Sequence, residues 1–458
     1  MHAGVKPLSH RRPIPSRVDW PKRAGFIIAS SLTLPIMLAW QAWRTSSLRY
    51  RHWLLTALVT MYGATITIRF DGSMAGADGV RHLGLVYYHY VGLSFSQFLV
   101  ELWHTLTFQI STDPGIRDPY KHIVSYLTGG VLGAPGLFFP VVAFVYGYFF
   151  TGSLLQVFKY FGSAKVNYVI IGFAAMFFLM QNIEGVNTVR TWTGMWILVY
   201  ACLMYYDTKK WRYIVLMLMP PFVHIGFWIM VIPAIAVLIF GNRPVLYAVL
   251  FVASSFTNLI PQDRMLETIS MSDRGELQVR SYQVDERTTV ESRLTQQAAS
   301  DQRFWRVFQK AGVQKWALNI LIYVVLAAGI YFGCMTYVQR SLFSVGLLTL
   351  TLSNSTWFLF ALSNRSWIIG AVFILGAFVM ANTQPASRAR IIQSNQPPYY
   401  KWGLHLSLLL FFPYFLYNLS VLLDYPSVFW LTAPFMVWVN PEINMSWKYL
   451  LQVLMGLR

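Results

Sequence analysis

The feature that most constrains this chain is a succession of long, continuously apolar stretches. Several of them approach or exceed the roughly 18–20 residues that a helix needs to cross the hydrocarbon core of a bilayer. Only 12% of the residues are charged, against about a quarter in an ordinary soluble domain. Because every backbone N–H and C=O in lipid must be paired within its own segment, these stretches should be helices. They do not alternate apolar and polar residues at period two, which argues against a β-barrel.

The sequence therefore predicts an all-α fold, a polytopic transmembrane helix bundle of about 12–13 spans, some of them short or broken. The candidate spans are 25–43, 52–68, 134–157, 166–183, 188–206, 212–240, 244–260, 316–338, 343–362, 367–383, 403–423 and 428–439.

The stretch 212–240 carries an interruption. It contains Pro220, Pro221 and Pro233, and His224 falls in its middle. Proline removes a helical hydrogen bond and breaks the ladder, so we expect two short helices that meet near His224 rather than one long, kinked helix. Broken helices inside membranes usually line a functional cavity.

Two polar segments divide the chain into four parts. Residues 1–24 form a polar, basic tail with no apolar core of the signal-peptide type. Residues 25–260 form a first transmembrane bundle, which includes an outer loop at 69–132 with an amphipathic, interfacial helix from Leu93 to Phe108. The charged composition of residues 261–315 predicts a large outer loop, and residues 316–458 form a second bundle.

The net charge of +18 is better explained by membrane topology than by nucleic-acid binding. Basic residues concentrate in short connections, which the positive-inside rule assigns to the cytoplasm. These connections are 44–52, 158–165, 207–212, Arg243, Arg340 and 384–401. The segments 69–132, 184–187, the break at His224, 261–315 and 363–366 then lie outside. The number of spans also puts the N-terminus outside, although residues 1–23 are rich in Lys and Arg.

Four cationic or titratable groups fall at helix ends on the outer side under this topology. Arg69 ends the second span, Arg190 starts the fifth, His224 lies at the break, and Arg365 lies in a short loop between two late spans. Each alone has an ordinary explanation, because a single arginine usually snorkels to the interface and a lone histidine often only packs. Their shared depth predicts convergence on one site, where arginine would bind phosphate oxygens.

No metal or cofactor site is expected. Asp71, Asp78, His82, His89, His104 and Asp113 lie on one loop, but their spacing matches no metal-ligand pattern. The chain has no phosphate-binding glycine loop. Cys202 and Cys334 sit inside apolar runs, which favours buried free thiols.

A series of short motifs follows the same order as in a known family. The motifs are Ile-Arg-Phe at Arg69, Ala-Asp-Gly at Asp78, Thr-Asp-Pro-Gly at 112–115, Val-Asn-Thr-Val-Arg-Thr at 186–191, a basic turn at 209–213, Phe222-Val223-His224, and later Asn364-Arg365. Between residues 60 and 240 this order resembles the EpsG family of exopolysaccharide polymerases, which are related to the Wzy O-antigen polymerases.

The resemblance implies a multi-pass protein of the bacterial inner membrane with a GT-C-like architecture and its active site facing the periplasm or the outside. It implies a metal-independent, cofactor-free glycosyltransferase. The substrates would be an undecaprenyl-diphosphate-linked glycan as donor and a second lipid-linked repeat unit as acceptor. A chain-length regulator and a flippase would be further partners, alongside membrane lipid but no nucleic acid.

Residue roles follow from the same resemblance. Arg190 and Arg365 would hold the diphosphate with help from Arg69, and His224 would accept a proton from the attacking sugar hydroxyl.

Other loop residues would bind sugar. Asp78 or Asp113 would orient sugar hydroxyls or His224, although a helix cap before Pro114 is the simpler explanation for Asp113. Tyr87 and His89, within the run 87–90, would stack on sugars or anchor the chain at the interface.

Three other functions remain open at the level of sequence. A ligase of the same architecture would transfer a finished glycan to lipid A core or protein. A lipid-linked sugar flippase or transporter would need ionisable groups near the bilayer midplane, and the spans are nearly free of carboxylates. A polyprenyl-phosphate-dependent glycosyltransferase would need an acidic metal-binding pair such as Asp71 and Asp78.

Overall fold

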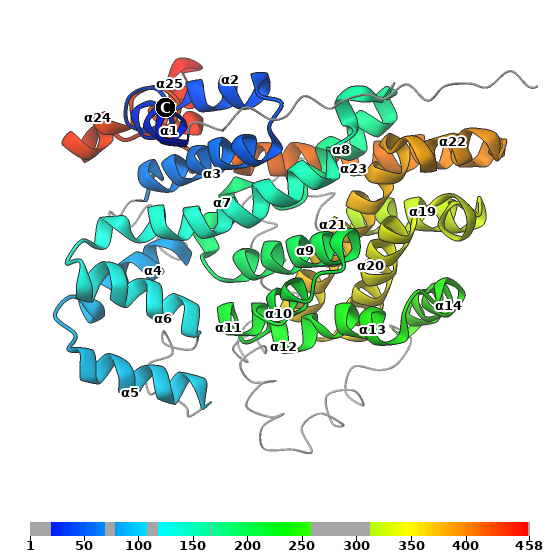
Figure 1. The fold of residues 1–458 in the computed structure, drawn as a ribbon, viewed down its shortest axis with the longest axis horizontal. Helices are drawn as coiled ribbons and strands as arrows, with labels where there is room; N and C mark the ends of the chain where they lie inside the picture. Colours follow the sequence, from blue (N-terminus) through cyan, green and yellow to red (C-terminus); the bar gives the residue numbers. More distant parts are fainter. Residues whose placement is uncertain (1–19, 69–77, 108–117, 165, 258–311, 457–458) are drawn as a thin grey trace, which may run out of the picture.

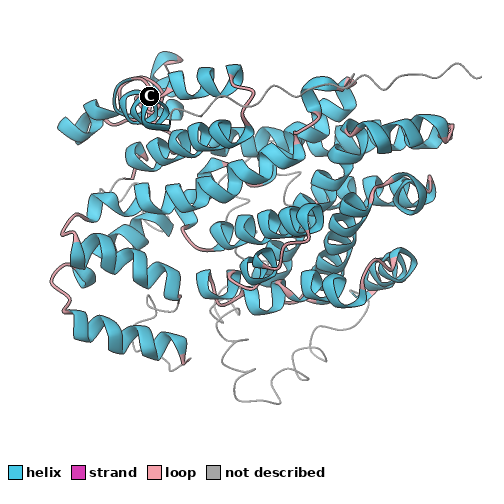
Figure 2. Ribbon diagram, viewed as in Figure 1, coloured by secondary structure: helices cyan, strands magenta, loops and turns pink. Residues whose placement is uncertain are grey.

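The protein is built from helices throughout the part that the computed structural model describes, which is residues 20–68, 78–107, 118–164, 166–257 and 312–456. Within these ranges the chain forms no named strand, and Figure 2 shows helices joined by short loops. The prediction of an all-α fold is confirmed for this part of the chain.

Four segments of the described residues are long and apolar enough to cross a membrane, judged by length and composition. The chain is therefore a membrane protein. The segments are Pro135–Val157, Tyr168–Thr188, Ala361–Thr383 and Pro398–Leu422. Several other predicted spans form shorter apolar helices, such as Pro244–Ser254 (α14) and Val313–Ala327 (α19).

Six helices from distant parts of the chain pack against one another in the main hydrophobic core, alongside others such as α19 (Figure 1). They are α3 (Leu48–Thr65), α7 (Phe138–Val157), α8 (Tyr168–Met180), α9 (Thr191–Thr208), α20 (Tyr337–Ser355) and α21 (Phe360–Thr383). Trp196 of α9 is fully buried, with the Phe150 ring centroid 4.9 Å away. At Gly63, α3 approaches α7 so closely that a Cβ would lie 2.4 Å from the carbonyl oxygen of Phe139. Only glycine permits this contact.

The stretch 212–240 is broken, as predicted from its prolines. It forms four short helices: α10 (Arg212–Met217), α11 (Pro220–Val223), α12 (Phe227–Met230) and α13 (Ile232–Phe240). Pro220 and Pro221 occupy the start of α11, where a missing N–H is tolerated. The backbone then becomes extended at His224, with φ −151° and ψ 123°. The interruption places this histidine at a helix end inside the molecule.

The predicted loop at 363–366 is wrong, because these residues lie within α21. Ser363 of this polar run pairs with the neighbouring helix. The Ser363 hydroxyl donates to the carbonyl oxygen of Ser353 at 2.9 Å, and the Ser353 hydroxyl donates to the carbonyl oxygen of Ser363 at 2.8 Å. Helix α21 therefore continues through polar residues that face α20, and Arg365 projects from a helix rather than from a loop.

The predicted first span, 25–43, is also wrong. The chain turns at Leu34 and Pro35 and forms two helices, α1 (Trp20–Thr33) and α2 (Ile36–Arg44). Helix α1 packs against α24 (Pro434–Val439), so the first and last described parts of the chain meet (Figure 1). The remaining helices of the C-terminal part are α22 (Pro385–Gln393), α23 (Pro398–Leu422) and α25 (Trp447–Leu454).

The described part of the predicted outer loop, 78–107 and 118–132, is largely helical. It forms α4 (Asp78–Leu85), the π-helical turn η1 (Val86–Tyr90), α5 (Phe95–Leu106), α6 (Pro119–Ser125) and the π-helical turn η2 (Tyr126–Val131). The expected helix within Leu93–Phe108 is thus present as α5. Helix α6 contacts both α7 and α11, which brings its start next to the break at His224.

Candidate functional site

A buried carboxylate, Asp118, lies at the centre of the candidate site. Asp118 immediately precedes α6 and occupies its N-cap position, but its side chain makes no capping hydrogen bond there. The side chain is instead directed into the core, and the residue is 1% exposed. Its Oδ1 accepts hydrogen bonds from the backbone N–H of Ile225 at 2.9 Å and from Nδ1 of His224 at 3.0 Å. Its Oδ2 accepts from Nη1 of Arg190.

Arg190 is held by an unusual turn in front of α9. The preceding residue, Val189, has φ 59° and ψ −58°, a region that a β-branched residue rarely adopts. The backbone N–H of Arg190 donates to the carbonyl oxygen of Thr188 at 2.6 Å, which closes a three-residue turn. Such strain persists only where surrounding structure enforces it. Here Val189 is fully buried, and the turn directs the guanidinium towards Asp118.

His224 connects Asp118 to the second arginine. Because a carboxylate can only accept, Nδ1 of His224 carries the proton in its bond to Asp118. The other nitrogen, Nε2, lies 3.3 Å from Nη1 of Arg365. A guanidinium can only donate, so Nε2 accepts and the imidazole is neutral in this arrangement. The result is a chain of contacts, Arg190–Asp118–His224–Arg365, whose members come from four separate segments.

Charge and hydrogen bonding keep Asp118 ionised. Burial by itself would raise the pKa of this carboxyl. The hydrogen bond from His224 and the positive charge of Arg190 outweigh burial, and together with the Ile225 N–H they bring the pKa well below its ordinary value. A buried, ionised carboxylate bonded to Nδ1 fixes the tautomer of an imidazole and stabilises its protonated form. The arrangement can therefore support proton transfer at Nε2.

The structure thus brings together three predicted site residues, Arg190, His224 and Arg365. Arg365 reaches the cluster from α21 and not from the expected loop. Two other predicted residues, Arg69 and Asp113, lie outside the described residues, as does Asp71.

The remaining predicted residues have other surroundings. Asp78 forms an ion pair with Arg81 at 2.7 Å near the surface. Tyr87 of η1 is 47% exposed. His89 contacts Glu101, with 3.0 Å between Nε2 and Oε2. Their sugar-binding roles stay predictions.

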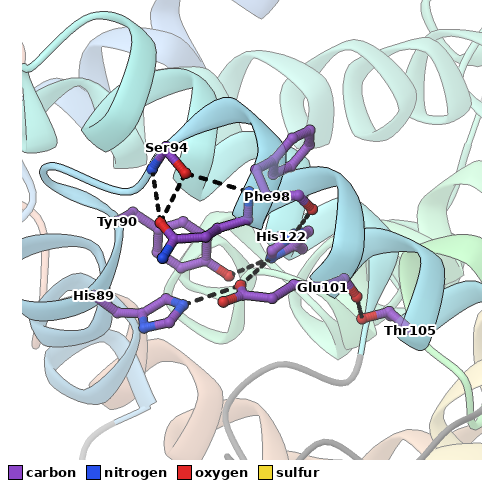
Figure 3. Close-up of polar contacts among 8 residues, drawn as sticks. His89, Tyr90, Ser94, Phe98, Glu101, Thr105 and His122 are labelled. Atoms are coloured by element: carbon purple, nitrogen blue, oxygen red, sulfur yellow. Dashed lines mark hydrogen bonds and ion pairs between the residues drawn. The ribbon is translucent and has the colours of Figure 1, made fainter.

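His89 belongs to a polar cluster that joins α5 to α6 (Figure 3). The hydroxyl of Tyr90 bonds Nδ1 of His122 at 2.6 Å, and Nε2 of His122 donates to the carbonyl oxygen of Phe98 at 3.1 Å. Burial lowers the pKa of His122, which keeps its ring neutral. Because both ring nitrogens of His122 have partners, the cluster acts as a structural link between the two helices.

Two cavities adjoin the region. One of about 200 Å³ is bounded by Pro119 and Ile225, the sequence neighbours of Asp118 and His224. A larger one of about 1010 Å³ lies between α3, α4, the start of α7, α24 and the segment after α24. Its volume is at the upper end of the range for small-molecule sites, which is about 300–1,000 Å³. Apolar side chains dominate its lining, which includes Ile66, Ile68, Leu83, Leu137, Pro140 and Val437.

Among the described residues, no group of three or more His, Cys, Asp or Glu side chains is placed to hold a metal ion. The two cysteines, Cys202 and Cys334, are free and buried, which confirms that prediction.

Asp118 is the site residue that sequence reasoning missed. Its local signal, an aspartate directly before a proline that starts a helix, is the signal of an ordinary helix cap. The same signal at Asp113 attracted a prediction, whereas Asp118 did not. Only the contacts with Arg190 and His224, which are 72 and 106 residues away in sequence, distinguish it.

Comparison of the chain with protein-family models, with curated proteins and with solved structures found no match.

Proposed function

We propose that this protein is a membrane polysaccharide polymerase, which transfers a glycan from an undecaprenyl diphosphate to another lipid-linked repeat unit. The observation that carries the proposal is the cluster Arg190–Asp118–His224–Arg365. It combines an oriented imidazole with two guanidinium groups, which are the groups expected for deprotonating a sugar hydroxyl and stabilising a phosphate leaving group.

In the proposed reaction the acceptor hydroxyl attacks the anomeric carbon of the donor glycan. The hydroxyl proton passes to Nε2 of His224, and Asp118 stabilises the resulting imidazolium through Nδ1. The bond between the anomeric carbon and the diphosphate oxygen breaks, and the oxygen keeps the electron pair. Arg365 shifts from Nε2 to the phosphate, which frees the nitrogen for the proton. Arg190 stabilises the negative charge on the diphosphate while it remains hydrogen-bonded to Asp118.

Two features support a lipid-linked substrate. Four segments of the described residues are long and apolar enough to cross a membrane, which suits a substrate that is anchored in the bilayer by its lipid. The apolar cavity of about 1010 Å³ is bounded by Leu83 of α4 and by Ile68, and it offers space for part of a hydrocarbon chain.

We further propose that the protein lies in a bacterial inner membrane with its basic connections in the cytoplasm. Residues 25–43 form two short helices, so we do not count them as a membrane span. With one span fewer, the basic N-terminal residues lie on the cytoplasmic side. The basic residues before α1 and those after α2 then lie on the same, cytoplasmic side, as the positive-inside rule requires.

The test uses purified full-length protein in liposomes with a single substrate, a bacterial undecaprenyl-diphosphate-linked oligosaccharide. A polymerase forms a ladder of longer lipid-linked products from this substrate alone. A ligase forms none without lipid A core or protein acceptor, and a flippase moves the substrate without lengthening it. We expect His224→Ala to lower the polymerisation rate about 10²- to 10⁴-fold, and Arg190→Ala or Arg365→Ala to lower it about 10²- to 10³-fold.

Matched control variants come from outside the cluster. His405→Ala removes a histidine that bonds Tyr168, and Arg390→Ala removes an arginine that bonds a backbone carbonyl in α22. Both should polymerise normally. The proposal is refuted when the three cluster variants insert in the membrane and still produce ladders of wild-type length.

A further inference from the structure

One face of α4 is buried beside the segment that leads into Arg190. At Gly79 the contact is so close that a Cβ would lie 2.1 Å from Oδ1 of Asn187 and 2.9 Å from Cδ1 of Ile68. Asn187 precedes Arg190 by three residues and lies in the 3₁₀ helix η5 (Ile183–Thr188), which packs against α4. Residues three apart share a helix face, so His82 lies on the same face of α4 as Gly79.

His82 is buried, and its ring nitrogens are not engaged in hydrogen bonds with the described residues. The residue is 1% exposed. Within the described part of the chain neither Nδ1 nor Nε2 has a hydrogen-bond partner. Buried polar side chains nearly always find a partner, and leaving one without a partner is unfavourable. This imidazole differs from those of His122 and His224, whose ring nitrogens are all engaged.

The charges around His82 are those of the candidate site. Burial, and then the positive charges of Lys121, Arg190 and Arg81, lower the pKa of His82, while Asp118 opposes them. Lys121 itself is 3% exposed and lies on the first turn of α6. The ring is therefore neutral at physiological pH, with one N–H donor and one acceptor nitrogen. A neutral donor beside cations is suited to a phosphate oxygen, which only accepts.

We propose that His82 is a substrate-binding residue, whose N–H donates a hydrogen bond to a phosphate oxygen of the lipid diphosphate beside Lys121 and Arg190. This inference rests on the proposed function, since the diphosphate is the leaving group of that reaction. The next residue, Leu83, lines the apolar cavity. Helix α4 thus carries a hydrogen-bond donor for phosphate, His82, next to a side chain that contacts hydrocarbon, Leu83. An amphiphilic ligand requires both kinds of contact.

The test measures binding of sugar-free undecaprenyl diphosphate to the full-length protein in detergent, together with the melting temperature of the unliganded protein. His82→Leu should weaken binding about ten- to hundredfold, because a hydrogen bond to a charged group is lost. The same variant should melt at the wild-type temperature or above it, because a polar group without a partner has been removed. His82→Gln keeps an N–H donor and should retain most of the affinity.

The control His405→Leu changes a histidine elsewhere in the chain and should leave binding unchanged. Undecaprenol, which has no phosphate, should bind His82→Leu and wild type equally. A normal affinity of His82→Leu for the diphosphate, or an equal loss of affinity for undecaprenol, would overturn the assignment.

The polymerisation assay on His224→Ala and Arg190→Ala tests the proposed function independently of the role of His82. If those variants lose polymerisation while His82→Leu binds undecaprenyl diphosphate normally, the role of His82 is refuted and the proposed function stands. If wild type does not bind undecaprenyl diphosphate at all, both proposals fail.

Discussion

At the scale of single residues, the site depends on one carboxylate used for tertiary contacts instead of for a local cap. Asp118 satisfies three donors from two other segments, and each donor is itself fixed by backbone features: the strained turn at Val189 for Arg190, and the break after Pro221 for His224. Replacing this residue therefore affects the orientation of His224 and the charge balance of Arg190 at once.

Asp118→Asn should reduce polymerisation by about 10³- to 10⁴-fold, as expected when an imidazole loses the carboxylate that sets its tautomer. The amide is neutral, and its NH₂ group cannot accept from the guanidinium or the imidazole. The rate of ladder formation in liposomes measures the effect. Asp207→Asn, at an exposed position on α9, is the control, and equal rates for the two variants would contradict the role of Asp118.

The same carboxylate should make stability depend on pH. Its pKa is lowered in the folded state relative to the ordinary value of 3.8. Its stabilising contribution is therefore complete above that value and is lost as the pH falls towards the folded-state pKa. Between about pH 6 and about pH 3 the melting temperature of the wild type should fall more than that of Asp118→Asn, which lacks this titration. Parallel curves would show that the group does not titrate as inferred.

At the scale of helices, sequence predicted the elements whose signals are local. Prolines at 220 and 221 marked the break at His224, and the polar-to-apolar change at Arg190 marked the start of α9. The loop predicted around Arg365 was wrong, because Ser363 and Ser366 lie within α21, where they are 5% and 0% exposed and Ser363 bonds α20. Ser363 pairs with a distant segment, and no local pattern in the sequence reveals such a contact. Asp118 was missed for the same reason, because its contacts with distant segments leave no local sequence pattern.

Helix α5 packs against α6 partly through one aromatic side chain, in addition to the polar cluster around His122. Phe98 is 7% exposed and stacks on His122 and Tyr126, with centroid distances of 4.7 and 4.1 Å. Phe98→Ala should destabilise this attachment by about 3–5 kcal/mol. Hydrogen exchange should show faster exchange of the α5 amides. Phe95→Ala removes a ring that is 63% exposed and should change exchange far less; similar exchange in both variants would contradict the attachment.

At the scale of the whole molecule, the proposed orientation can be tested with thiol chemistry. Both natural cysteines are buried, so a membrane-impermeant maleimide should leave the wild type unlabelled. Asp78→Cys should be labelled in intact cells, because this side chain is 46% exposed and belongs to a segment that we propose lies outside. Asp207→Cys should be labelled only after permeabilisation, because its connection is basic. The reverse pattern would invert the topology.

The bonds that build the cluster join residues 72, 106 and 141 positions apart in sequence. During synthesis the ribosome releases Asp118, Arg190 and His224 long before Arg365, and early segments begin to fold while later ones are still missing. Contacts this distant in sequence form late, since the intervening chain must first be ordered. The cluster therefore stays incomplete in the nascent chain until α21, which carries Arg365, has been synthesised and packed.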